Sequence, residues 1–122
     1  MTNQDNINNS DILNNVVIEG MQNIKANEII SLNLKDIETA VCDYFIICHG
    51  TSNTHVNAIA DSVIEETLKT LSDKPFSKEG MQSGEWILLD YGNVVVHVFQ
   101  KEIRDFYNIE KLWGDAVINH IK

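Results

Sequence analysis

The sequence predicts a single α/β domain, in which helices pack on a mixed sheet of about five strands. Two segments, Ser10 to Lys25 and Val56 to Leu71, carry apolar residues at helical spacing. The run from Asp43 to Cys48 is almost continuously apolar, which is typical of a central strand covered on both faces. Two further apolar runs bracket Gly92-Asn93, which favours a tight hairpin turn. The strand–helix–strand order favours a partly parallel sheet.

The first third of the chain predicts one helix and one strand. Residues 1–9 are polar and rich in Asn, so we expect a disordered tail before a domain over residues 10–122. Ser10 is expected to cap the first helix, which continues to about Lys25. The alternation from Glu28 to Leu34 predicts a short strand.

The middle of the chain predicts a strand, a helix and a short strand. His49 to Ser52 is expected to end the strand over Asp43–Cys48 and to supply helix caps. The following helix has one apolar stripe and ends before Pro75. Phe76 to Glu79 is expected to form a short strand.

The last third predicts a hairpin and a final helix. The turn sets a register in which the core face is formed by the pairs Tyr91–Val94, Leu89–Val96 and Ile87–Val98. The opposite face is mixed and holds Trp86, Leu88, Asp90, Val95, His97 and Phe99. A final helix is expected to open with Leu112-Trp113.

The net charge of −9 argues against non-specific DNA or RNA binding, which needs a field that attracts phosphates. It is compatible with docking onto a basic protein, or it serves only solubility. The sequence has no apolar run of about 18 residues and no basic region followed by an apolar stretch at its start. We therefore expect a cytoplasmic protein that neither spans a membrane nor binds DNA directly.

Cys42 and Cys48 are expected to be free, buried thiols. If both belong to one strand, they share a face but lie roughly 20 Å apart, at ~3.3 Å per residue. A disulfide needs Cα atoms within about 7 Å. The sequence has no CxxC, no HExxH and no Cys/His cluster, so we expect no metal site and no cofactor.

Two features have acid–base or anion-binding residue types. Gly50, Thr51 and Ser52 stand between a strand and the best helix, where backbone N–H groups could bind an anion, although a glycine turn with a Thr or Ser cap is the favoured interpretation. Asp90 and His97 are diagonal neighbours in the hairpin and form either an acid–base pair, a polar pair or partner contacts. Neither feature has the spacing of a catalytic motif, so we expect no catalytic residues and no enzyme.

The aromatic residues favour an interface. Trp86 shares a face with Asp90 and His97, which makes a core position difficult for it. Aromatic residues and Arg are enriched at interface hot spots. Lys101 and Arg104 fall in the same part of an otherwise acidic chain. A surface that binds another macromolecule is therefore the favoured interpretation.

An ordered set of motifs covers about residues 12 to 117. The set comprises Asp43 to Ile47, Gly50-Thr51-Ser52 with His55, Ala58 to Asp61, Glu79-Gly80, Trp86 to Gly92, Val94 to Phe99, Arg104, Tyr107, and Leu112 to Ala116. With these motifs the chain resembles the ribosomal silencing factor S family, also called the Iojap-like family.

The resemblance implies a compact α/β domain similar to the nucleotidyltransferase fold. It implies binding to the large ribosomal subunit through ribosomal protein L-fourteen, so that the small subunit cannot join and translation is repressed under nutrient limitation. It also implies a homodimer when the protein is free, and a role in large-subunit assembly is an alternative. A degenerate nucleotide-binding protein is a further alternative, although Gly92 stands where a second metal-binding carboxylate would be needed.

On this basis we expect a contact surface with Trp86 and Tyr107 as its apolar anchors. Acids such as Asp90 would meet basic groups of the ribosomal protein. The full set expected to bind the partner is Trp86, Leu88, Asp90, His97, Lys101, Arg104 and Tyr107.

Overall fold

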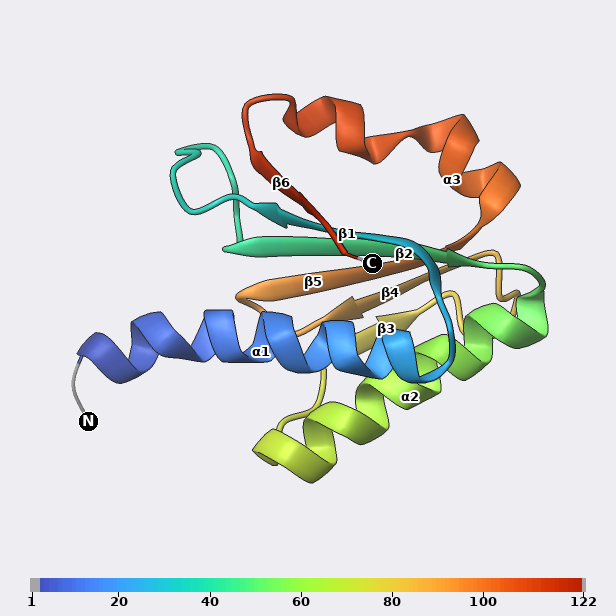
Figure 1. Cartoon of the computed structure of the whole chain (residues 1–122), viewed down its shortest axis with the longest axis horizontal. Coiled ribbons are helices and arrows are strands. Elements are labelled where there is room, and N and C mark those ends of the chain that lie inside the picture. The colour runs from blue at the N-terminus through green and yellow to red at the C-terminus, as the bar shows by residue number, and fades with distance from the viewer. Residues whose placement is uncertain (1–2, 122) are drawn as a thin grey trace.

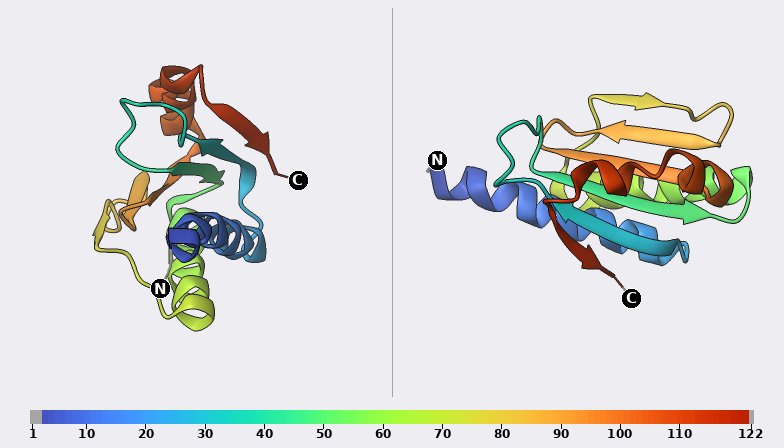
Figure 2. Two further views of the ribbon diagram at one scale, coloured as in Figure 1. Left: turned by 90° about the vertical axis from the view of Figure 1, so that its left-hand side faces the viewer. Right: turned by 90° about the horizontal axis from the view of Figure 1, so that it is seen from above.

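The structure, a computed structural model, describes residues 3–121 as a six-stranded mixed sheet with helices on both faces (Figure 1). Helices α1 and α2 lie side by side on one face, and the third helix lies on the other (Figure 2). The elements are α1 (Asn3–Asn23), β1 (Asn27–Asn33), β2 (Tyr44–Gly50), α2 (Asn53–Leu71), β3 (Ser77–Glu79), β4 (Trp86–Asp90), β5 (Val94–Gln100), α3 (Lys101–Tyr107), the 3-10 helix η1 (Ile109–Trp113) and β6 (Val117–His120). The predicted fold class is confirmed.

The sheet order is β3-β4-β5-β2-β1-β6, so β2 and β5 are central, as the apolar run of β2 predicted. These two strands are parallel, and the other pairs are antiparallel. The expected hairpin register is confirmed, because Ile87 lies opposite Val98 and Leu89 opposite Val96. None of the helices within residues 3–121 has the length and apolarity that crossing a membrane requires.

Each face of the sheet has its own buried cluster. The larger cluster lies under α1 and α2 and includes Val17, Ile46 and Val98. The smaller cluster lies under α3 and η1 and includes Leu32, Phe99 and the half-buried Trp113. A sheet covered on both faces explains why β2 and β5 are apolar along nearly their whole length.

The N-terminal helix begins earlier than expected. Helix α1 starts at Asn3, so residues 3–9 are helical where a tail was expected, and Ser10 is a buried position within the helix rather than its cap. Residues 1 and 2 of that expected tail lie outside the described residues. The polarity of residues 1–9 predicted a tail, whereas in the structure residues 3–9 extend a helix that is anchored further along the chain by Leu13 and Val17.

The expected final helix is wrong. Helix α3 and η1 lie earlier in the chain, and Val117–His120 forms β6 on the edge of β1. Strand β6 satisfies backbone groups of β1 that a helix at this position would leave unpaired. The strand end expected at His49 is also too early, because β2 continues to Gly50 in register with Gln100 of β5.

Both cysteines are buried and free, as expected, but they do not share a face. Cys42 precedes β2 and belongs to the cluster under α3. Cys48 lies within β2 and belongs to the cluster under α1 and α2. Burial raises the pKa of Cys48 to about 12, which makes it an unreactive core thiol.

Candidate functional site

The Trp86 surface, which we define as Glu79, Gly80, Trp86, Leu88 and Tyr107, lies on the α3 side of the sheet edge. Strand β4 places Trp86 and Leu88 on the same side because they are two residues apart. Glu79, Gly80, Trp86 and Leu88 line a shallow cavity of about 280 Å³. Gly80 has φ +84°, and a Cβ there would lie 1.9 Å from the Trp86 carbonyl oxygen, so this close approach requires glycine.

The Trp86 ring is held by aromatic neighbours. Its centroid lies 4.8 Å from that of Phe99, which is fully buried, and 4.9 Å from that of Tyr107, which is half exposed. Stacked and tilted aromatic pairs at such distances stabilise a fixed ring orientation. Trp86 is therefore a partly exposed aromatic residue on a rigid support.

His97 orients the Trp86 indole through a hydrogen bond. The Trp86 Nε1–H donates to His97 Nδ1 at 3.1 Å, which requires Nδ1 to be unprotonated. Burial lowers the pKa of His97 to about 4, so the ring is neutral at pH 7. Its proton is then on Nε2, a buried atom without a hydrogen-bond partner among the described residues. The ring packs against Phe45, at 4.8 Å between centroids, rather than against a carboxylate.

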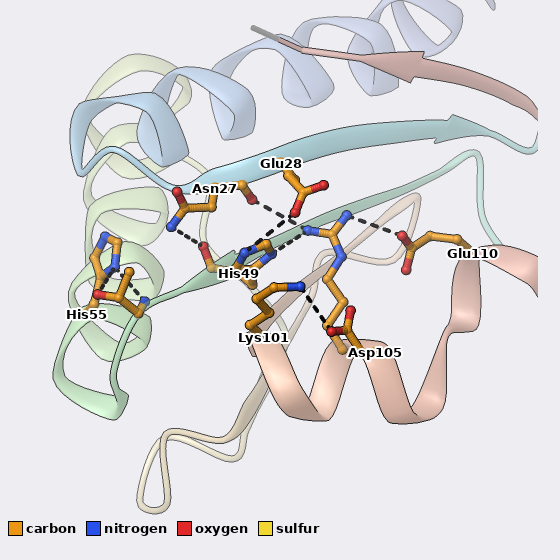
Figure 3. A network of polar contacts seen from close by, with 9 residues as sticks. Asn27, Glu28, His49, His55, Lys101, Asp105 and Glu110 are labelled. Carbon is orange, nitrogen blue, oxygen red and sulfur yellow. Dashed lines mark hydrogen bonds and ion pairs between the residues drawn. The ribbon is translucent and has the colours of Figure 1, made fainter.

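Helix α3, which carries Tyr107, is held to the sheet by Arg104. Figure 3 shows Asn27, His49 and Glu110, which take part in this polar network. The buried guanidinium donates to His49 Nδ1 at 2.9 Å, to the Asn27 carbonyl oxygen at 3.4 Å and to Glu110 Oε2 at 3.2 Å. Since Arg cannot accept, His49 Nδ1 is the acceptor and the His49 ring is neutral. Burial and the positive charge of Arg104 lower the pKa of His49, which is consistent with that state.

The structure brings some of the expected contact residues together and separates others. Trp86, Leu88 and Tyr107 lie together at the Trp86 surface. Asp90 instead accepts a hydrogen bond from the Gly92 backbone N–H at 2.8 Å, so it is not paired with His97. Lys101 is exposed, lines a different cavity and pairs with Asp105 at 3.0 Å.

His97 and Arg104 are buried, at 4% and 6% exposure. They therefore support the surface instead of lying on it, because α3 and η1 cover this part of the sheet. Sequence reasoning did not place Glu79 and Gly80 at the site. Glu79 is paired with Leu88 and so shares its face, but Ser77–Glu79 is polar and exposed throughout, so no hydrophobic alternation signalled this register.

The Gly50-Thr51-Ser52 turn lies beside a cavity of about 380 Å³, and polar groups of Thr51 and Ser52 form hydrogen bonds within the chain. The Thr51 N–H donates to His55 Nδ1 at 2.9 Å, and Ser52 Oγ accepts from the His55 N–H at 3.1 Å. His55 Nε2 donates to the Ile24 carbonyl oxygen at 2.7 Å, which uses the second ring nitrogen. The turn caps α2 with Ser52 and carries a bridging histidine, so the Thr51 N–H, one of the backbone donors expected to bind an anion, is already used within the chain.

In the part of the chain that the structure describes, no group of three or more acidic, histidine or cysteine side chains is arranged to bind a metal ion. His49 Nε2 and Glu28 Oε2 are the nearest approach of such groups beside Arg104, at 3.8 Å.

The model of the family "Ribosomal silencing factor during starvation" matches residues 7–122. The chain is 40% identical over 101 residues to ribosomal silencing factor RsfS of Halalkalibacterium halodurans, which covers 83% of this chain and 85% of that protein. It is 44% identical to the Bacillus subtilis RsfS over 92 residues, which are 75% of this chain and 76% of that protein.

A solved structure and a more distant relative extend these similarities. A crystal structure of a Chromobacterium violaceum protein superposes with a TM-score of 0.80 at 39% identity and covers 85% of each chain. The mouse protein named mitochondrial assembly of ribosomal large subunit protein 1 is 36% identical over 78 residues, which are 62% of this chain and 34% of that protein.

Proposed function

Because the chain belongs to the ribosomal silencing factor family, we propose that it represses translation by occupying the large ribosomal subunit. In this proposal it binds ribosomal protein L-fourteen and sterically blocks the small subunit from joining. The proposed activity is binding, without a chemical step, so the chain needs neither a catalytic residue nor a cofactor for it.

The observation that carries the proposal is the Trp86 surface. A partly exposed tryptophan that is already fixed by Phe99, Tyr107 and His97 has little side-chain freedom to lose on binding. Large aromatic residues of this kind are frequent hot spots of protein interfaces. Glu79 lines the same cavity, in a chain of net charge −9, so the surface suits a basic protein.

The seven expected contact residues have different roles in this proposal. Trp86, Leu88 and Tyr107 form the apolar contact, and Asp90 and Lys101, which lie outside the cavity, would pair with charged groups of the partner. His97 and Arg104 act indirectly, because the first orients Trp86 and the second anchors α3.

Co-sedimentation with purified large subunits tests the proposal. The wild-type chain should pellet with free large subunits and should prevent small subunits from joining them. Trp86→Ala should weaken binding by about 2 kcal/mol or more, which is roughly 30-fold. Phe76→Ala is the matched control, since Phe76 is an exposed aromatic residue outside the Trp86 surface. Equal affinity of the Trp86→Ala variant, if it is folded, would contradict the assignment of this surface.

A role in large-subunit assembly is the second candidate, and the name of the mouse relative favours it. The two functions differ in the particle that is bound. A repressor binds mature large subunits, whereas an assembly factor prefers incomplete precursors. Sedimentation of the chain with both particles, at equal concentrations, separates the two functions.

The free protein is proposed to form a homodimer that dissociates before it binds the ribosome. If the Trp86 surface serves both contacts, Trp86→Ala should lower the dimer affinity together with the affinity for large subunits. Analytical ultracentrifugation of the two proteins measures the first quantity. A variant that stays dimeric but loses ribosome binding would assign the two contacts to different surfaces.

A further inference from the structure

A second apolar surface lies on the α2 side of the molecule. We define the Phe76 surface by the residues that line a cavity of about 360 Å³, which are Ile64, Leu68, Lys74, Pro75, Phe76 and Lys78. Phe76 is 83% exposed and Leu68 is 52% exposed. Two large apolar side chains that are this exposed beside one cavity are unusual for a surface without a partner.

The edge strand β3 separates this surface from the Trp86 surface. Lys78 is paired with Leu89, whose side chain belongs to the core under α1 and α2, and Glu79 is paired with Leu88 of the Trp86 surface. Neighbouring residues of a strand point to opposite faces of the sheet. One molecule can therefore use the two surfaces at the same time.

The exposed Phe76 is held in place by its backbone and by its ring. Its N–H donates to the Asp90 carbonyl oxygen at 2.7 Å, which continues the pairing of β3 with β4. Its ring lies over Gly92, where an added Cβ would approach the Phe76 Cε2 atom to 2.9 Å. The ring therefore lies against the turn between β4 and β5 without being covered.

The charged residues that line this cavity have the opposite sign to the net charge of the chain. Its lining contains two lysines and lacks a carboxylate, although the chain has 18 acidic and 9 basic residues. Among the described contacts, neither Lys74 nor Lys78 has an ion pair, whereas Lys35, Lys69 and Lys101 each have one. Two unpaired ammonium groups beside an apolar cavity provide sites for carboxylates.

We propose that the Phe76 surface binds an acidic amphipathic segment of another protein. One large apolar side chain of that segment enters the cavity between Leu68 and Phe76, and its carboxylates pair with Lys74 and Lys78. The geometry is that of an amphipathic helix in a groove. A protein fits better than RNA because a net charge of −9 repels a phosphate backbone and because four of the six residues that line the cavity are apolar.

The test is a selection of displayed random 12-residue peptides on the immobilised full chain, followed by affinity measurements with the selected peptides. Selected peptides should have net negative charge and at least one large apolar residue. The double variant Lys74→Glu, Lys78→Glu should bind them at least 10-fold more weakly, and Leu68→Ser should do the same by removing the apolar wall. Lys25→Glu, Lys111→Glu is the matched control, with the same change of charge at exposed lysines elsewhere.

A charge exchange completes the test. Peptides in which Glu and Asp are replaced by Lys should bind the double variant better than the wild-type chain. Selection of no peptide, of neutral or basic peptides, or of peptides that bind the double variant with unchanged affinity would overturn the proposal. Two other outcomes would overturn it as well: poly-uridylate binding that the double variant loses, which indicates RNA, and a homodimer that the double variant cannot form, which indicates a second copy. None of these results depends on ribosome binding by the Trp86 surface.

Discussion

The Trp86 surface and the Phe76 surface both expose an aromatic ring beside an apolar cavity, but they differ in charge and in support. Glu79 lines the first cavity, and Lys74 and Lys78 line the second. The Trp86 ring contacts Phe99, Tyr107 and His97, and a buried arginine stabilises the helix that carries Tyr107. Among the described contacts, Phe76 has a backbone hydrogen bond and lies against Gly92, without an aromatic partner.

The two surfaces therefore depend on different kinds of residue. The Trp86 surface depends on buried residues that do not touch the partner, so mutations in the core should disable it. The Phe76 surface depends on the exposed residues themselves, so mutations there should alter binding with little effect on folding. The following predictions test this separation, and they are ordered from the largest expected effect to the smallest.

Replacing Arg104 by Met should have the largest effect. The change leaves Glu110 and His49 without their partner in a buried place, and breaking such a contact typically destabilises a protein by about 3–5 kcal/mol. The free energy of unfolding, measured by urea denaturation, should fall by an amount in this range. Because α3 carries Tyr107, binding to large subunits should weaken as well, whereas peptide binding by folded molecules at the Phe76 surface should persist.

Lys101→Met is the control for the Arg104 variant. Lys101 lies on the same helix and pairs with Asp105, but both side chains are exposed, so the stability should change little. If the two variants were equally stable, the idea that Arg104 anchors α3 would be wrong.

The second prediction concerns the loss of folding stability at acid pH. The folded-state pKa of His97 is about 4, below its ordinary value of 6.5, so the unfolded chain takes up the proton first as the pH falls. The stability due to the neutral ring is complete above pH 6.5, decreases between pH 6.5 and about 4, and does not decrease further below that range. The shift corresponds to about 3 kcal/mol.

His97→Leu should remove this part of the pH dependence. The free energy of unfolding should be measured at several pH values between 7.5 and 4 for both proteins, as should that of the control His120→Asn, which changes an exposed histidine. His49 also has a lowered pKa and remains in all three proteins, so some acid sensitivity persists. Parallel curves for the wild-type and His97→Leu chains would show that His97 is not buried as a neutral ring.

The third prediction isolates the hydrogen bond that orients Trp86. Trp86→Phe keeps an aromatic ring but removes the Nε1–H that donates to His97. A hydrogen bond of this kind contributes about 1 kcal/mol, so the affinity for large subunits should fall roughly fivefold. Trp113→Phe is the matched control, since this second tryptophan packs on Phe45 and lies outside the Trp86 surface. A loss as large as that of Trp86→Ala would mean that indole area, rather than orientation, dominates.

Much of the fold could be predicted because it depends on local patterns. The alternation of β4 and β5 and the turn at Gly92, with φ +87°, determined the hairpin register. The last segment could not be predicted, because the apolar residues between Leu112 and Ile121 fit a helix and a strand alike. The segment forms a strand because it pairs with the free edge of β1, which is distant in the sequence.

The candidate site was predicted in part for a similar reason. The mixed face of the hairpin indicated Trp86 as a poor core residue, and Trp86 is indeed half buried beside Tyr107. His97 and Arg104 were expected on the surface because their side chains are polar. His97 is buried against Phe45 and Trp86, and Arg104 is buried because α3 packs on the sheet with this side chain inward. Both result from tertiary contacts that residue types do not reveal.

The smallest effect on stability is expected at Phe76, whose exposed ring contrasts with the supported ring of Trp86. Phe76→Ser removes a ring that is 83% exposed, so the free energy of unfolding should change by less than about 0.5 kcal/mol. Leu89→Ser, on the strand paired with β3, is the contrasting variant, because Leu89 is fully buried and its loss leaves a cavity in the core. Thermal and urea unfolding of the two variants measures the difference. A large destabilisation by Phe76→Ser would mean that this ring stabilises the edge of the sheet, and its exposure would then no longer argue for a partner.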